Sequence, residues 1–234
     1  MMKAIVSEYC RTRKFILSKE TLASEKLLTF SIPIGIIRSS SQDGVIMDNR
    51  TNILKTALGL FSSCGYEAVG VQEVAVKAGI TKPTLYHYFG SKEGLLCDLL
   101  AVNSEKLSNV LREAADYKGN LPLTLEMVAR AYVRFAENNP EFYRLQLSLW
   151  FAPPDSYPAK AVTGHLEEQY HLIESLFIKA AGNHGNMKGR HQRYALSFIG
   201  MINTYIEMLF KKYLTLDDRM VHLIVHQFMH GIFS

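Results

Sequence analysis

Between residues 81 and 92 the chain gathers cationic, hydroxyl and aromatic side chains at short spacing. The segment reads Thr-Lys-Pro-Thr-Leu-Tyr-His-Tyr-Phe-Gly-Ser-Lys. Ammonium and hydroxyl groups donate hydrogen bonds to phosphate oxygens, and they also contact the edges of nucleobases in the grooves of a duplex. This combination of residue types indicates a surface that contacts nucleic acid.

The charged and small residues of this segment have distinct expected partners. Thr81, at the start of a predicted helix, offers its hydroxyl and backbone N–H groups to a phosphate. Lys82, on the first exposed turn, reaches either a phosphate or O6 and N7 of guanine. Pro83 and Thr84 present a surface that suits a thymine methyl group. Lys92 opens the next helix, where its charge converges on the same phosphate strand.

Two amphipathic aromatic residues stand in the middle of the predicted reading helix. Tyr86 and His87 are adjacent, and we expect one to contact the DNA backbone and the other a base edge. Leu85 and Phe89 are expected to face the core, because they lie four residues apart on one helix face. The reading helix is therefore predicted from near Thr81 to near Phe89.

The preceding residues predict the element that holds this helix in place. Val71, Val74, Ala75 and Ala78 form the inner face of a short helix that stops at Gly79. Small residues beside a tight glycine turn let two helices cross at a steep angle. The pair is a helix-turn-helix, whose second helix can enter a major groove.

Further helices are predicted on either side of this pair. Asp48 is a plausible N-cap for a helix that ends before Gly65, and another helix begins after Ser91. The inward face of the first of these helices is expected to hold Ile53, Leu54, Ala57, Leu58 and Phe61.

The run Leu-Tyr-x-Tyr-Phe-x-Ser-Lys-Glu, at residues 85–93, closely resembles the signature of the tetracycline-repressor (TetR) family, and the resemblance covers about residues 50–100. It implies a DNA-binding transcriptional regulator, most commonly a repressor that a small-molecule effector releases from its operator. It also implies that Tyr86 and Lys92 contact phosphates. The partners implied are a double-stranded DNA operator, an effector of unknown identity and a second copy of the chain.

One position departs from the family pattern, and the charge of the region gives little support. Gly70 stands where the family usually has Ser or Thr, so a phosphate contact is either lost or moved to Gln72 or a backbone N–H. Residues 48–100 carry five Lys/Arg and five Asp/Glu, within a chain of net charge +4. Binding must therefore depend on individually placed cations, among which Arg50 is a further candidate.

The fold class predicted for the chain is all-α, because no strand pattern appears after residue 48. We expect three parts: an accessory or weakly ordered extension at 1–46, a helix-turn-helix domain at 47–95, and a helical effector-binding and dimerisation domain at 96–234. The extension is either natural or the product of a translation start placed upstream of Met47. Proline and glycine breaks predict the later helices at 121–138, 140–151, 156–182, 188–213 and 217–232.

The family resemblance implies that the C-terminal helices bind an effector. The middle helices are rich in aromatic residues, and ligand pockets in helical bundles are mostly apolar and lie between helices. For any single one of these residues core packing is the more common role. Arg130, Arg134 and Arg144 could meet an anionic effector, although exposed arginines are the norm. The candidate pocket residues are Tyr132, Phe135, Phe142, Tyr143, Trp150, Tyr170 and Phe177.

The last two predicted helices are apolar over more than half of their circumference. One bundle cannot hide such helices on one side only, so we expect them to pair with those of a second copy as a four-helix bundle. Internal core packing is the alternative. The predicted interface residues are Ile199, Ile202, Ile206, Phe210, Leu223 and Phe228.

Other classes of function find little support in the sequence. No glycine-rich phosphate loop or hydrolase motif is present, so an enzyme is not expected, and neither is a cofactor. His222, His226 and His230 have a metal-like spacing on one face, but a histidine stripe without a metal is the preferred interpretation. No run is long enough for a membrane span, so a cytoplasmic protein is expected. The competing hypothesis is a helical ligand-binding module that has lost DNA binding.

Overall fold

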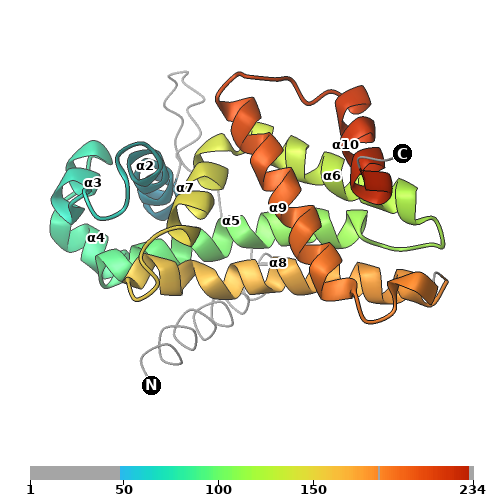
Figure 1. The fold of residues 1–234 in the computed structure, drawn as a ribbon. Coiled ribbons are helices and arrows are strands. Elements are labelled where there is room, and N and C mark those ends of the chain that lie inside the picture. Colours follow the sequence, from blue (N-terminus) through green and yellow to red (C-terminus); the bar gives the residue numbers. More distant parts are fainter. Residues whose placement is uncertain (1–47, 184, 232–234) are drawn as a thin grey trace, which may run out of the picture. The chain divides into compact units, whose positions relative to one another are not determined.

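The computed structural model describes residues 48–183 and 185–231, and this part of the chain is built from helices without a strand (Figure 1). The all-α prediction is confirmed for these residues, whereas the predicted extension at 1–46 lies outside them. None of the described helices is long and apolar enough to cross a membrane. In chain order the helices are α2 (Asn49–Cys64), α3 (Val71–Lys77), α4 (Lys82–Phe89), α5 (Lys92–Ala114), α6 (Leu121–Asn138), α7 (Pro140–Trp150), α8 (Tyr157–Ala181), the 3₁₀ turn η1 (Gly185–Met187), α9 (His191–Phe210) and α10 (Asp218–His230).

The chain divides into two compact units, and the division falls inside α5, between Leu99 and Leu100. The predicted boundary, at residue 95, lies in the same helix. The sequence shows no linker at either position. A helix that runs from one unit into the next carries no proline, glycine or polar break at the boundary, so composition cannot locate it.

The first unit is held together by one apolar core. Helix α2 packs on α3, and α3 packs on α4. Ile53, Ala57 and Phe61 are buried as predicted, and Leu60 joins them. Leu54 and Leu58, which were also predicted to face inward, are only half-buried.

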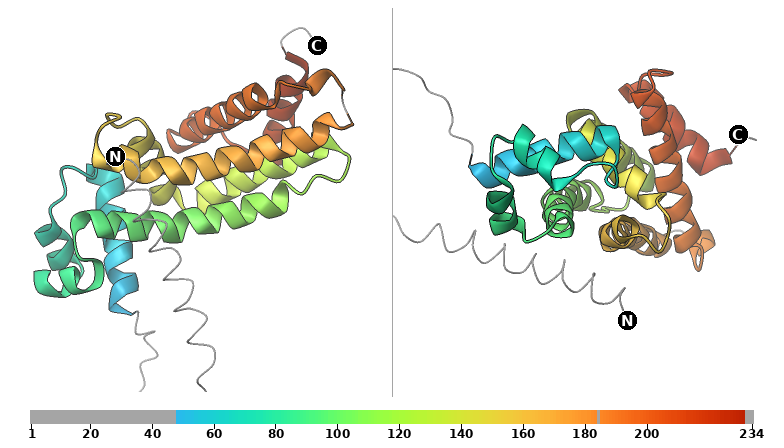
Figure 2. Two further views of the ribbon diagram at one scale, coloured as in Figure 1. Left: turned by 90° about the horizontal axis from the view of Figure 1, so that it is seen from below. Right: turned by 90° about the vertical axis from the view of Figure 1, so that its left-hand side faces the viewer.

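The second unit is a layered helical bundle (Figures 1 and 2). Helix α9 lies across α8 and also contacts α6, while α10 packs mainly on α6. Helix α7 fills the space between α6 and α8. Helix α9 therefore packs on α8 and α6 with one face, which holds the buried residues Ala195, Phe198, Ile202 and Ile206.

Helix α9 ends three residues before the predicted residue 213. Its last turn closes with the Schellman pattern, in which the N–H of Tyr213 donates to the carbonyl of Met208 and that of Lys212 to Leu209. Lys212 takes the left-handed position at φ 60°, where glycine is usual. The sequence holds no glycine there, so nothing local signalled the end of this helix.

Candidate nucleic-acid interface

The turn between α3 and α4 has the hydrogen bonds of a Schellman motif. The N–H of Ile80 donates to the carbonyl of Ala75 at 3.0 Å, and that of Gly79 donates to Val76 at 3.1 Å. Gly79 has φ 70°, a conformation that a side chain disfavours. The predicted glycine turn is thus present, and it fixes the direction in which α4 leaves α3.

A side chain from α2 completes this turn. The amide of Asn52 donates from Nδ2 to the carbonyl oxygen of Ala78 at 2.9 Å. That carbonyl is at the end of α3, where the helix has no partner of its own for it. Sequence reasoning missed Asn52, because a polar residue on an otherwise ordinary helix face does not reveal a partner 26 residues away.

Helix α4 begins with a well-formed N-cap. The hydroxyl of Thr81 accepts from the backbone N–H of Thr84 at 3.3 Å, and the two threonine hydroxyls lie 2.8 Å apart. Pro83, in the first turn, has no N–H to donate. The expectation that Thr81 offers a hydroxyl and several free N–H groups to a phosphate is therefore reduced, because capping already occupies the hydroxyl and the N–H of Thr84.

The two faces of α4 are cleanly separated. Leu85 and Phe89 are fully buried, as predicted, and fasten the helix to the core. The opposite face is exposed to solvent, so the side chains expected to read DNA point away from the domain. Its exposed members are Lys82, Pro83, Tyr86 and His87, with Thr84 half-buried beside them.

Aromatic contacts order this exposed face. The ammonium of Lys82 lies 5.7 Å from the ring centre of Tyr86, within the range of a cation–π contact. The rings of His87 and Tyr88 meet edge to face at 5.7 Å. These contacts restrict the rotamers of side chains that are otherwise in solvent.

Lys92 is held more firmly than an ordinary surface lysine. Its Nζ lies 4.2 Å from the ring centre of Tyr66 and 3.4 Å from the carbonyl oxygen of Glu67. Ser91 caps the same helix, since its hydroxyl accepts from the N–H of Gly94 at 3.0 Å. An ammonium has three N–H donors, so Lys92 keeps donor capacity for a phosphate while its position is fixed.

Arg50 makes a contact within the first unit that the sequence did not reveal. Its Nη2 donates to Oδ2 of Asp98 at 3.1 Å, and the Asp98 side chain is only 2% exposed. Its guanidinium carbon lies 5.7 Å from the ring centre of Phe89. These contacts hold the start of α2 against α4 and α5, and the contact of Arg50 with DNA stays a prediction.

The start of α3 has no hydroxyl side chain to cap it, because Gly70 stands where the family usually has Ser or Thr. Gly70 is the N-cap and makes no side-chain cap. Gln72, two residues further on, is exposed, and so is Val76, whose side chain is 67% exposed on the same short helix. Gln72 is therefore available for the polar contact that a hydroxyl at position 70 would otherwise make.

Most of the predicted effector-pocket residues are buried in the second unit, and their role in a pocket stays a prediction. Tyr132, Phe142, Tyr143 and Phe177 are fully buried core residues, and Trp150 is 51% exposed at the end of α7. The hydroxyl of Tyr143 donates to Oδ1 of Asn203 at 2.6 Å. Burial raises the pKa of the hydroxyls of Tyr132 and Tyr143 above the usual tyrosine value. Tyr170 is half-buried, and Phe135 borders a hollow described below.

The predicted interface residues divide between the core and the surface of the protomer, and their role in an interface stays a prediction. Ile202 and Ile206 are buried in it. The ring of Phe210 meets that of Tyr143, and Phe228 packs against Phe177 and Phe198. Both phenylalanines and Ile199 are half-buried, whereas Leu223 is 50% exposed.

The histidine stripe on α10 has an acidic neighbour that the sequence did not reveal. Nδ1 of His222 lies 2.8 Å from Oε1 of Glu126 on α6, and the rings of His226 and His230 are 4.4 Å apart. Within residues 48–183 and 185–231, no group of three or more metal-ligating side chains is placed to hold an ion.

The DNA-binding helices have relatives among known proteins. Residues 53–99 match the model of the family described as bacterial regulatory proteins, tetR family. The chain is 32% identical over 98 residues to the transcriptional activator FasR of Mycolicibacterium smegmatis, covering 42% of this chain and 45% of FasR. It is 27% identical over 133 residues to the repressor KstR of the same organism, covering 57% and 63%. These alignments thus span about half of FasR and somewhat less than two thirds of KstR.

Solved structures share the architecture over most of the chain. The regulator FadR from Bacillus subtilis in complex with stearoyl-CoA aligns with a TM-score of 0.66 and 16% identity, covering 77% of this chain and 98% of FadR. AibR in complex with isovaleryl coenzyme A and operator DNA aligns with a TM-score of 0.61 and 21% identity, covering 76% and 96%. At such identities the likeness is one of fold. Residues 53–99, which hold the helix-turn-helix, therefore carry the signature of the TetR family of bacterial regulatory proteins.

Proposed function

We propose that the protein is a cytoplasmic, DNA-binding transcriptional regulator, and specifically a repressor that a small-molecule effector releases from its operator. The observation that carries the proposal is the exposed face of α4, on which Lys82, Tyr86 and His87 point to solvent next to the firmly held Lys92. The family supports regulation, and KstR, a relative, is named as a repressor. FasR is named as an activator, so the sign of regulation needs its own measurement.

A repressor of this kind would act as a homodimer. The exposed apolar residues of the last two helices are Leu196 on α9, at 62%, and Leu223 and Met229 on α10, at 50% and 37%. Pairing about a two-fold axis would bury these side chains against their copies and present two α4 helices to one duplex. The operator would then be an imperfect palindrome with half-sites about one helical turn, or somewhat more, apart.

DNA binding is tested by removing the two lysines of the interface. Lys82→Ala/Lys92→Ala should reduce affinity for a selected operator by more than tenfold and lower the salt dependence by about two units of slope. Thr84→Ala and His87→Ala should change sequence preference more than overall affinity, because they face base edges. Gel shifts at several salt concentrations, with operators selected from random DNA, measure both.

A charge-matched control separates this interface from a general electrostatic effect. Lys106 and Lys179 are exposed on α5 and α8, outside the first unit, so Lys106→Ala/Lys179→Ala removes the same charge and should leave operator binding intact. If the Lys82/Lys92 variant keeps wild-type affinity, the interface is wrong. Wild-type protein that selects no DNA sequence would favour the competing hypothesis of a ligand-binding module without DNA binding.

A further inference from the structure

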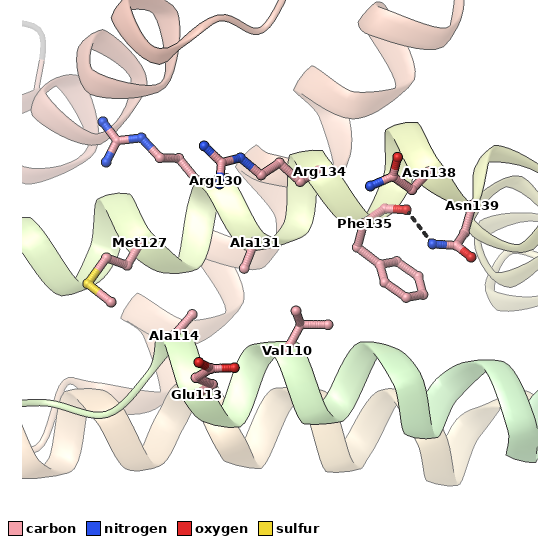
Figure 3. A pocket seen from close by; sticks show the side chains of 10 residues that line it. All are labelled: Val110, Glu113, Ala114, Met127, Arg130, Ala131, Arg134, Phe135, Asn138 and Asn139. Atoms are coloured by element: carbon pink, nitrogen blue, oxygen red, sulfur yellow. Dashed lines mark hydrogen bonds between the residues drawn. The ribbon is translucent and has the colours of Figure 1, made fainter.

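A hollow of about 380 Å³ opens between α5 and α6, within the second unit (Figure 3). Met127, Ala131 and Phe135 line it from α6 and point toward α5, and Val110 and Ala114 point back from α5. The three residues of α6 are spaced by four, so they form one stripe along the helix. At ~1.5 Å per residue this stripe is roughly 12 Å long.

The lining of the hollow is apolar surface that the protein itself leaves uncovered. Met127 is 44% exposed and Val110 is 39% exposed, although both are large apolar side chains. Exposed apolar area favours any apolar group that can cover it, at roughly 25 cal/mol per Å². An elongated alkyl chain fits such a stripe better than a compact ring system does.

Two cations stand one turn apart at the edge of the same hollow. Arg130 and Arg134 line it from α6, and in Figure 3 their guanidinium groups lie on the side of α6 away from α5. They also line a second hollow of about 300 Å³ near the start of α10. Arg134 is exposed and forms no ion pair with another residue in the described part of the chain. Glu113 lies on the opposite, α5 edge, so an anion is favoured on the α6 side.

Arg130 connects this edge to α10. Its Nη2 lies 3.0 Å from Oε2 of Glu126, and its Nε lies 2.8 Å from Oδ1 of Asp218, the first residue of α10. An anion that reaches Arg130 competes with Asp218 for the guanidinium. Occupancy of the hollow would thereby weaken a bond that fastens α10 to α6.

We propose that the α5–α6 hollow binds an anionic amphiphile, with its alkyl chain along Met127, Ala131 and Phe135 and its anionic group extending past the edge of α6 to Arg134 and Arg130. The proposal rests on the proposed function, since it names the chemical class of the effector. A neutral apolar ligand would leave Arg134 without an ionic partner, and a cationic ligand would be repelled by both arginines.

The binding test uses the full chain and isothermal titration calorimetry without DNA. The probes are octanoate, decanoate and dodecanoate below their micelle concentrations, the matching coenzyme A thioesters, and decanol as the neutral partner of decanoate. Affinity should rise about fourfold for each added methylene until the stripe is filled. Decanol should bind at least tenfold more weakly than decanoate or its thioester.

Two variants separate the chain site from the anion site. Ala131→Phe fills the stripe and should remove the dependence on chain length, while Arg134→Gln should remove the preference for an anion over decanol. Arg193→Gln, on the exposed face of α9, is the matched control and should change neither. Circular dichroism melts verify that each variant is folded.

The outcomes decide the proposal independently of DNA binding. If the fatty acids and the thioesters both bind, a carboxylate is sufficient as the anionic group. If only the thioesters bind, the coenzyme A phosphates are the anionic group. Either result supports the proposal. No saturable binding by either series, or binding that Ala131→Phe and Arg134→Gln leave unchanged, overturns it. A protein that binds its operator but no amphiphile keeps the proposed function and loses this effector class.

Discussion

The two lysines of the candidate interface illustrate how neighbours prepare a residue for binding. Lys82 is exposed with an aromatic ring beside it, whereas Lys92 is held by the Tyr66 ring and the Glu67 carbonyl. A long side chain that is already ordered loses less conformational entropy when it meets a phosphate. Lys92 is therefore expected to contribute more affinity for its charge than Lys82 does.

Arg50 provides a prediction at the same scale. Arg50→Gln removes a cation that pairs with Asp98, a carboxylate that is 2% exposed, and so weakens the compensation of that buried charge. Because Arg50 is itself 26% exposed, the expected loss is about 1–3 kcal/mol of unfolding free energy, below the full cost of breaking a buried pair. Urea denaturation followed by circular dichroism measures it.

A role of Arg50 in DNA binding predicts a different result for the same variant. If Arg50 contacts DNA, Arg50→Gln will leave stability unchanged and lower the salt slope of operator binding by about one unit. Arg112→Gln is a suitable comparison, because that arginine pairs with Glu105 and Glu168 at an exposed site, where little stability should be lost.

At the scale of elements, the direction of α4 depends on a few backbone groups. The Schellman bonds at Gly79, the amide of Asn52 on the Ala78 carbonyl and the Thr81 cap all lie within one turn. Each satisfies a backbone group that a helix end leaves without a partner. The reading helix is thus oriented by local chemistry as well as by its two buried residues.

Two glycines give a matched test of this turn. Gly79→Ala should lower stability by about 1 kcal/mol, because φ 70° is strained for a side chain even though a Cβ there meets nothing within 4 Å. Gly164→Ala, inside α8 and also free of contacts, should raise stability by up to about 1 kcal/mol. Thermal melts of both variants measure the difference, and equal shifts would show that the turn does not constrain Gly79.

At the scale of the whole molecule, the question is how two copies associate. Helix α9 lies across α8 and also contacts α6, so the apolar residues on that face, Phe198, Ile202 and Ile206, are already covered within one protomer. The apolar side chains that remain exposed on α9 and α10 are fewer than the sequence suggested. Any dimer formed by these helices must use that smaller set, centred on Leu196 and Leu223.

The dimer is tested by placing charge on the exposed positions. Leu196→Glu and Leu223→Glu should give monomers by light scattering, with unchanged helical content and weak operator binding, because two buried like charges would face each other across the axis. Phe151→Glu, at a residue that is 80% exposed on another helix end, should remain dimeric. Dimers that persist in both α9 and α10 variants would place the interface elsewhere.

A charge at the originally predicted positions would report something different. Ile206 is fully buried in the protomer, and Phe228 packs against two aromatic rings of the core. Glutamate at either position should therefore lower folding stability itself. Loss of dimers in Ile206→Glu or Phe228→Glu would accompany loss of helical structure, and so would not locate an interface.

The sequence by itself determined the all-α class and the helix-turn-helix. Its signals are local: Gly79 at the turn, Thr81 at the cap, and the spacing of Leu85 and Phe89 all act within a few residues of where they stand. The same short-range regularity indicated that Lys82, Tyr86 and His87 would face solvent. The ends of the helices were predicted less accurately. Helix α9 ends before the predicted residue, where Lys212 adopts the left-handed conformation, and a lysine gives no sign of this in the sequence.

Only the tertiary structure decided which partner each side chain meets. Periodicity cannot show that Arg50 pairs with Asp98, that Lys92 rests on Tyr66, or that Asn52 completes a turn 26 residues away. Most of the aromatic residues of the second unit are buried, with Phe135 beside a hollow, and α9 covers one of its apolar faces against α8 and α6. An apolar residue is equally suited to a core, a pocket or a dimer, and only the arrangement of the helices around it distinguishes them.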